Sequence, residues 1–417
     1  MENKKSGIMH YAWLVLLATI IFNFFYAMTY STISLYMVPW LEAFPQYTRT
    51  AFSWVSSLHS VTSTVLLLFF GKLTKKFDMR ILCSIGALGA AIGLFIYSIA
   101  TNIWIFYLGA LFVGFSCAFC ATTTTSILVN RWFGKLQNTL LAVSMTIGGF
   151  GGTVGSIWVG KNISALGYAP TLKKASLIML VVAVVIFVLI RNYPKDRKTS
   201  MLWQEEQDTE ANTQKKDASG VPFKAALKTP NFWFIIIFWV LFAMFFYGTY
   251  VNLANVMYDF GLEASVVGVI FSFVATAMTI AMIPGGAILD FLGARRLMVI
   301  LTLIFAVILA VLGFTTPDAG MMRIICIFFG IVYLIPKICV PAVIKTCFGN
   351  KDLPTILGIA TGCITFGAIF ASPMLNRVYD ITGSYSGAFK VCAFGAVACA
   401  IICLVFIRKC KKDWVEE

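Results

Sequence analysis

The segment Gly286-Ala-Ile-Leu-Asp290-Phe-Leu-Gly293-Ala-Arg295-Arg296 separates two long apolar stretches of the chain. A related segment, Gly71-Lys-Leu-Thr-Lys75-Lys-Phe-Asp78-Met-Arg80, stands 215 residues earlier and again lies between two apolar stretches. The same offset relates Arg131-Trp-Phe-Gly134 to Thr346-Cys-Phe-Gly349. Two independent motifs at one offset indicate an internal repeat, so we expect the chain to consist of two related halves.

The composition places both halves in a membrane. Of the 417 residues, 59% are hydrophobic and 12% are charged, and the mean hydropathy is +0.87. Soluble proteins carry about 25% charged residues, so half of the usual polar surface is missing. This composition excludes a soluble enzyme, a nucleic-acid-binding protein and a disordered regulator.

Twelve stretches are long and apolar enough to cross a bilayer, which needs about 20 residues per helix. The hydrophilic segment 191–230 divides them into six and six. We therefore predict an all-α membrane protein with twelve transmembrane helices in two pseudo-symmetric six-helix bundles, 1–190 and 231–417, joined by a linker. The predicted spans are 11–37, 52–71, 81–100, 103–129, 139–160, 175–191, 231–257, 266–289, 297–316, 321–346, 355–376 and 386–407.

Lys and Arg predict the orientation of these spans. With the N-terminus in the cytosol, most of the 32 basic residues fall in cytosolic loops and in the linker. Both termini are therefore expected to be cytosolic, and the net charge of +14 reflects this bias rather than a nucleic-acid partner. We expect a multi-pass protein of the plasma (inner) membrane whose partners are the lipid bilayer and a small-molecule substrate.

The segment Gly286–Arg296 resembles the loop signature of the major facilitator superfamily, G-x-x-x-D-x-x-G-x-R/K-R/K. The resemblance implies a transporter that works by alternating access. Glycine allows helices to approach closely, and Asp290 can cap a helix N-terminus or pair with a basic residue across the bundle. Gating or structural roles are expected for Gly71, Asp290, Gly293 and Arg295. The first copy departs from the signature, with Lys75 at the Asp position and Asp78 at the second Gly position.

Three shorter motifs are similar to the oxalate/formate antiporter and monocarboxylate porter group: Arg49-Thr-Ala-Phe-Ser-Trp54, Asn130-Arg-Trp-Phe133 and Thr229-Pro-Asn-Phe-Trp233. This resemblance implies a small organic anion as substrate. Oxalate antiporters carry a basic residue in span eight and another in span eleven, but here these places fall on Met282 and about Ile364. A dianion such as oxalate is therefore disfavoured. Span eight also lacks the Asp–Arg pair of animal monocarboxylate porters, which disfavours lactate–proton symport by their mechanism.

Lys337 is the strongest candidate for a functional residue because a charge within the hydrocarbon is costly. At 1.5 Å per residue it lies about 13 Å from the cytosolic end of its span, beyond the reach of a lysine side chain. Pro341 lacks the N–H that would bond the carbonyl of Lys337, so the span is expected to kink. Tyr333 lies one turn earlier, and it matches a cavity-lining aromatic position of the resembled antiporters. We predict that Lys337 binds an anion with Tyr333 beside it; the alternative is a lysine that tilts into a wet vestibule.

His59 could carry a coupling proton or bond the substrate. The alternative is a neutral histidine that hydrogen-bonds Ser or Thr on neighbouring spans. Other polar or aromatic residues that could face a central cavity are weaker candidates, because a role as a helix-packing hydroxyl or an interfacial aromatic explains each of them better. They are Asn23, Tyr26, Tyr30, Thr122, Tyr247, Tyr250, Asn252, Thr361 and Thr365.

The motifs of other protein classes are missing from the sequence. The glycine-rich run 148–155 has no following Lys-Ser/Thr and is expected to allow close helix packing rather than phosphate binding. With two histidines and scattered cysteines, no metal site, cofactor or enzymatic activity is expected. The expected function is secondary active or facilitative transport of a small, monocarboxylate-like organic anion by exchange or uniport, in a monomer. The alternatives are efflux of neutral or lipophilic compounds and a transporter-like sensor that does not transport.

Overall fold

The computed structural model describes residues 11–119, 122–133, 137–192, 220–349 and 352–405. The regular secondary structure within this part is helical, and an isolated β-bridge joins Gly220 to Gly349. The helices are α1 (Tyr11–Tyr30), η1 (Ile33–Tyr36), α2 (Met37–Ala43), α3 (Arg49–Lys76), α4 (Met79–Ser98), α5 (Ile103–Phe119), α6 (Thr122–Trp132), α7 (Gln137–Leu166), α8 (Tyr168–Leu189), α10 (Phe223–Ala226), α11 (Pro230–Asp259), α12 (Ala264–Leu292), α13 (Ala294–Phe314), α14 (Ala319–Val332), η3 (Ile335–Cys339), α15 (Val340–Phe348), α16 (Leu353–Thr382) and α17 (Ser386–Val405).

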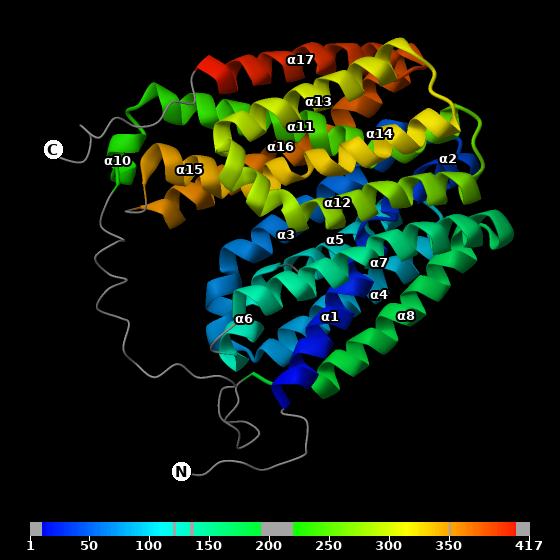
Figure 1. The fold of residues 1–417 in the computed structure, drawn as a ribbon. Coiled ribbons are helices and arrows are strands. Elements are labelled where there is room, and N and C mark those ends of the chain that lie inside the picture. The colour runs from blue at the N-terminus through cyan, green and yellow to red at the C-terminus, as the bar shows by residue number, and fades with distance from the viewer. Residues whose placement is uncertain (1–10, 120–121, 134–136, 193–219, 350–351, 406–417) are drawn as a thin grey trace.

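The helices form two bundles that lie side by side, with α1 to α8 in one and α11 to α17 in the other (Figure 1). We call them the N-bundle and the C-bundle. The end of the molecule where α8 finishes at Leu189 and α11 begins at Pro230 is called the linker end. Most of the predicted linker, 193–219, lies outside the described residues, as do both chain termini. The domain limits 1–190 and 231–417 therefore remain predictions.

Eleven helical segments of the described chain are long and apolar enough to span a membrane. One of them, Ala319–Phe348, combines α14, η3 and α15. The helix α3 has 28 residues, but its basic and hydroxyl residues, with Arg49 at one end and Lys76 at the other, keep its hydropathy low. Together with α3 the helices number twelve, and the predicted all-α, twelve-helix membrane fold is confirmed.

The internal repeat is visible in equivalent contacts of the two bundles. Arg80, at the start of α4, donates to the carbonyl of Phe187 near the end of α8. Arg295 lies 215 residues later at the start of α13, and it donates to the carbonyls of Cys403 and Leu404 near the end of α17. The last carbonyls of a helix lack intrahelical partners and attract cations. Arg295 therefore caps a helix in the C-bundle as Arg80 does in the N-bundle.

Of the remaining signature residues, Gly293 and Asp290 make no contact comparable to those of Arg80 and Arg295 among the described residues. Gly293 joins α12 to α13 with φ of +78°, a conformation that glycine adopts without steric cost. Asp290 is exposed, and its carboxylate makes no hydrogen bond or ion pair with a described residue, so the predicted capping or pairing is not formed in this conformation. Gly71 lies within α3, and the surroundings of its side-chain position are not described.

The glycine run in α7 lets α1 approach closely, in agreement with the prediction from the sequence. A Cβ atom on Gly151 would lie 1.9 Å from the carbonyl oxygen of Phe24, whereas one on Gly358 of α16 would meet nothing within 4 Å. We expect Gly151→Ala to lower the thermal unfolding midpoint of the purified protein, since overpacking costs about 1–3 kcal/mol. Gly358→Ala is the matched control, and a better helix former there should leave the midpoint unchanged or raise it. Equal midpoints for both variants would contradict this packing.

Candidate functional site

A group of charged and aromatic residues joins the bundles at the end opposite the linker end, which we call the closed end. Arg49 begins α3, and its guanidinium forms two hydrogen bonds with the carboxylate of Asp259, at 2.5 and 2.9 Å. The guanidinium carbon also lies 3.7 Å from the ring centroid of Tyr379. Asp380 of α16 accepts hydrogen bonds from the backbone N–H groups of Arg49 and Thr50, at 3.1 and 3.0 Å, and so caps a helix of the other bundle. We call these five residues the latch.

The bundles also meet along α7 and α12. A Cβ atom on Gly268 would lie 2.4 Å from the carbonyl oxygen of Ser156, so the two backbones are in close contact there. The hydroxyls of Thr153 and Thr276 are hydrogen-bonded at 2.9 Å. The described close contact between α7 and α12 that lies farthest from the closed end is that of Gly149 with the side chain of Thr279.

Every hydrogen bond between described residues of the two bundles lies on the closed-end side of the molecule. The deepest on the α3–α16 side joins the hydroxyl of Ser57 to the carbonyl of Ile369. The described contacts therefore hold the two bundles together at the closed end.

Lys337 occupies a break in its membrane span. The helix α14 ends at Val332, a π-helical segment runs from Ile335 to Cys339, and α15 begins at Val340. Such local π-helical turns are frequent at functional sites. The Lys337 side chain is accessible, and its Nζ lies 5.5 Å from the ring centroid of Tyr333. The single ion pair among the described residues is that of Arg49 and Asp259, so no described carboxylate neutralises Lys337.

Four tyrosines from both bundles converge on this region. Tyr30 of α1 is 40% exposed although it lies within the protein, where it stacks on Tyr26 at a ring distance of 5.6 Å. The next residue, Ser31, lies against the C-bundle, since a Cβ atom on Gly152 would be 2.9 Å from the Ser31 hydroxyl and 3.1 Å from Ala275 of α12. The C-bundle contributes Tyr247, Tyr250 and Tyr333, whose rings all contact Phe246 or Phe329. These four tyrosines and Lys337 are called the central site below. Because they come from α1, α11, the end of α14 and η3, the site lies between the two bundles.

Comparisons with known proteins place this arrangement in a family. The family model described as Major Facilitator Superfamily matches residues 19–256 and 244–416. The chain belongs to the Major Facilitator Superfamily. Its members are transporters and are not enzymes in general, so family and fold support transport of a small molecule by a multi-pass membrane protein. A search of curated proteins gives no match.

Solved structures of other superfamily members share the fold. A crystal structure of the nucleoside transporter NupG covers 96% of this chain and 100% of its own, with a TM-score of 0.74 and 14% identity. A bacterial homologue of the human lysosomal transporter Spinster, in an inward-facing and unoccupied conformation, covers 96% of both chains with a TM-score of 0.69 and 13% identity. At these identities the likeness shows the fold alone, so the oxalate/formate and monocarboxylate resemblance stays a prediction.

Other candidates from the sequence lie away from the central site. His59 is 2% exposed and is hydrogen-bonded to Tyr97 of the same bundle at 2.6 Å. A tyrosine therefore provides the partner that was expected from Ser or Thr. Thr361 is exposed and donates to the carbonyl of Leu357 one turn earlier. The side chain of Thr122 is not described, although its backbone begins α6.

Asn252 belongs to a buried polar network rather than to the central site. It has no exposed surface, and its Oδ1 accepts hydrogen bonds from Asn255 at 2.9 Å and Asn376 at 2.8 Å. The network continues to Tyr385, which donates to Asn376 and accepts from Arg49. Asn252 thus supports the closed end from inside the C-bundle.

Sequence reasoning missed the latch. Asp259 and Asp380 lie just beyond the predicted spans 231–257 and 355–376, whereas in the structure they belong to α11 and α16 and face the start of α3. The available signal was Arg49, a basic residue just before the predicted span 52–71. That signal could not identify the partners, because they are 210 and 331 residues away.

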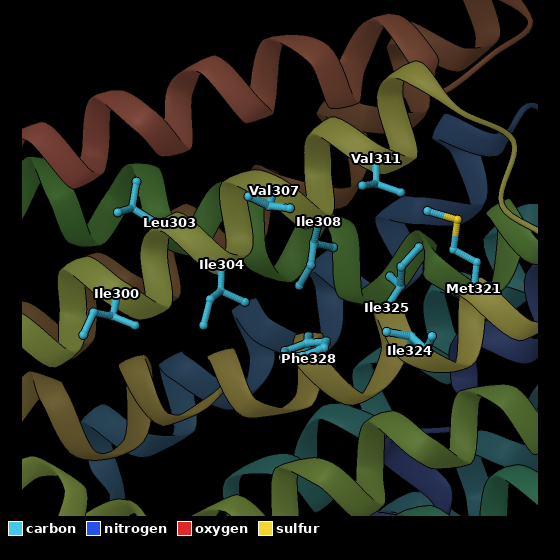
Figure 2. Close-up of a pocket in the computed structure, with 10 residues that line it drawn as sticks. All are labelled: Ile300, Leu303, Ile304, Val307, Ile308, Val311, Met321, Ile324, Ile325 and Phe328. Carbon is cyan, nitrogen blue, oxygen red and sulfur yellow. The ribbon is translucent and has the colours of Figure 1, made fainter.

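A separate apolar groove lies on the surface of the C-bundle between α13 and α14 (Figure 2). Its volume is about 530 Å³, and each of its lining side chains is apolar. The lining residues are Ile300, Leu303, Ile304, Val307, Ile308, Val311, Met321, Ile324, Ile325 and Phe328. It contains none of the candidate residues and offers no group to orient a polar substrate.

Proposed function

We propose that this member of the superfamily transports a small organic monoanion and that Lys337 binds the anionic group. The observation that carries the proposal is the accessible ammonium of Lys337 in a broken membrane span without a described carboxylate partner. An unpaired charge at this depth is costly and persists where it serves a ligand or an ion. An anion that reaches Lys337 gains a charge-assisted hydrogen bond and neutralises this charge.

A monoanion fits the central site better than a dianion. The places at which oxalate antiporters carry further basic residues fall on Met282 and about Ile364, and both are neutral. Ile364 is 8% exposed and packs in the core. One cation among phenol groups matches one negative charge.

Alternating access gives the latch its role. In the proposed orientation the linker end faces the cytosol, in accordance with the positive-inside rule, and the closed end faces outward. We propose that the bundles separate at the linker end, so that this conformation presents the central site to the cytosol. We further propose that the protein acts as a monomer in the plasma (inner) membrane, with both termini cytosolic, by exchange or uniport.

A neutral aromatic compound is the second candidate, favoured by the four tyrosines of the central site. The likeness to a nucleoside transporter rests on the fold and carries no substrate, but it makes nucleosides useful test compounds. A sensor that binds its ligand without transport is the third candidate.

A thermal-stability panel tests the proposed function. Purified protein is heated with organic monoanions, dianions, cations, neutral metabolites and nucleosides, since a ligand of the folded state raises the unfolding midpoint by mass action. The proposal expects stabilisation by one or more monoanions and less by the corresponding dianions and neutral amides. Stabilisation by neutral or cationic compounds alone would contradict it.

A further inference from the structure

The central site contains far more aromatic surface than a small aliphatic anion needs. On the C-bundle side, Tyr250 is nearly parallel to Phe329, with a ring distance of 6.4 Å and an interplanar angle of 11°. Phe329 stacks on Phe246 at 4.7 Å, and Phe246 is 6.1 Å from Tyr333 at 25°. The ring planes of Tyr250 and Tyr333 are thus fixed by a stack behind them.

The N-bundle provides one ring opposite this stack. Tyr30 is held by its stack on Tyr26, with an interplanar angle of 20°, and 40% of its surface stays accessible. The next residue, Ser31, lies where the bundles meet, because a Cβ atom on Gly152 would be 2.9 Å from the Ser31 hydroxyl and 3.1 Å from the side chain of Ala275 in α12. A planar molecule between the bundles would meet rings on both sides.

The phenol hydroxyls are available to a ligand. Those of Tyr30, Tyr247 and Tyr250 make no hydrogen bond with a described residue; Tyr30 is exposed, and the hydroxyls of the half-buried Tyr247 and Tyr250 are not among the sealed buried atoms. A hydroxyl in an apolar environment is costly when it has no partner, so water or a ligand must satisfy these groups. A ligand ring that bears a hydroxyl or another polar substituent would form hydrogen bonds with these tyrosine hydroxyls.

Lys337 sets the position of such a ring. Its Nζ lies 5.5 Å from the ring centroid of Tyr333. When the anionic group of a ligand binds Nζ, the rest of the ligand therefore lies beside the ring of Tyr333 and near the other aromatic rings of the site.

We infer that the substrate is an aromatic monoanion with a polar ring substituent, held by Lys337 at its charge and between Tyr30 and the C-bundle tyrosines at its ring. This inference rests on the proposed function and narrows its substrate class. Aromatic rings prefer offset-stacked or edge-to-face contacts with other rings, and these contacts add to the affinity that burial alone provides. The site would therefore distinguish an aromatic acid from a saturated acid of the same size.

Four probe compounds separate the ring from the charge: 4-hydroxybenzoate, benzoate, cyclohexanecarboxylate and 4-hydroxybenzamide. Affinities are measured by thermal shift or calorimetry with wild-type protein and with Tyr30→Leu, Tyr30→Phe and Lys337→Ala. We expect benzoate to bind about tenfold more tightly than cyclohexanecarboxylate, and 4-hydroxybenzoate to bind more tightly still. Tyr30→Leu should remove most of the advantage of benzoate. Tyr30→Phe should keep that advantage and lose part of the gain from the hydroxyl.

The outcomes distinguish this inference from the proposed function. Equal affinity for benzoate and cyclohexanecarboxylate, with both lost in Lys337→Ala, overturns the aromatic inference and leaves anion binding standing. If 4-hydroxybenzamide binds as tightly as 4-hydroxybenzoate and Lys337→Ala changes neither, the proposed anion function fails while the aromatic site stands. Stabilisation by aliphatic anions alone, or by no anion at all, overturns the inference. Binding of the probes in Tyr30→Leu with unchanged preferences also overturns it.

Discussion

Lys337→Ala is expected to weaken anion binding by about 10- to 100-fold, because hydrogen bonds to charged groups are worth about 1.5–3 kcal/mol. At anion concentrations that raise the unfolding midpoint of the wild type, the midpoint of Lys337→Ala should stay unchanged. The fold should tolerate the change, since no described carboxylate pairs with Lys337 and alanine leaves no buried charge. The unliganded midpoint should therefore stay the same or rise.

Two variants control this experiment. Lys345→Ala removes an exposed lysine in the last turn of α15, outside the central site, and should leave anion affinity unchanged. Lys337→Arg keeps the charge with a different geometry and should keep part of the affinity. If Lys337→Ala and Lys345→Ala behave alike toward every stabilising anion, Lys337 does not bind the substrate.

The double variant Asp259→Asn with Asp380→Asn is expected to open the closed end of the molecule. The Arg49 side chain is 11% exposed and that of Asp259 is 25% exposed, so their hydrogen-bonded ion pair is partly shielded from water. Losing one partner of such a pair costs about 2–5 kcal/mol when it is buried, and removal of the Asp380 cap adds to this loss. Even a shift of 1.4 kcal/mol would raise the population with separated bundles by about tenfold.

Labelling of a new cysteine measures that shift. Ser57 is 2% exposed and lies deep in the closed end, so Ser57→Cys should react slowly with a membrane-impermeant maleimide applied from outside. We call Asp259→Asn with Asp380→Asn the latch variant, and we expect Ser57→Cys to react about tenfold faster or more in this background than in the wild-type background. The latch variant without Ser57→Cys measures the background reaction of the native cysteines. Asp318→Asn is the matched control, because Asp318 caps only its own helix, α14, through the N–H of Met321. Equal rates in the latch and control variants would show that the latch does not hold the bundles together.

The twelve spans could be predicted because a bilayer imposes a minimum length on helices that cross it: eleven segments of the described chain are also apolar enough, and α3 has 28 residues. The break at Lys337 was predictable for a local reason, since Pro341 removes one backbone hydrogen bond from that turn. The placement of Tyr333 beside Lys337 follows from the same local geometry, as residues four apart lie on one face of a helix.

Other features depend on which face of a helix turns toward which neighbour, and the sequence does not contain that directly. Asn252 and Tyr250 are two residues apart on α11, yet Asn252 is fully buried in a hydrogen-bond network while Tyr250 belongs to the central site. The latch needs Arg49 to meet acids from another bundle, so it appears only when both bundles are assembled. His59 likewise finds its partner, Tyr97, on a different helix.

Counterflow in proteoliposomes is the most direct test of the central claim, that the protein moves an anion held by Lys337. Vesicles loaded with an unlabelled stabilising anion are diluted into medium with a trace of the labelled compound, for wild type and Lys337→Ala in parallel. The account predicts transient accumulation of label in wild-type vesicles and little or none with Lys337→Ala. No accumulation in wild-type vesicles, despite binding of the same anion, would indicate a sensor. Equal accumulation with both proteins would show that Lys337 is not the anion site.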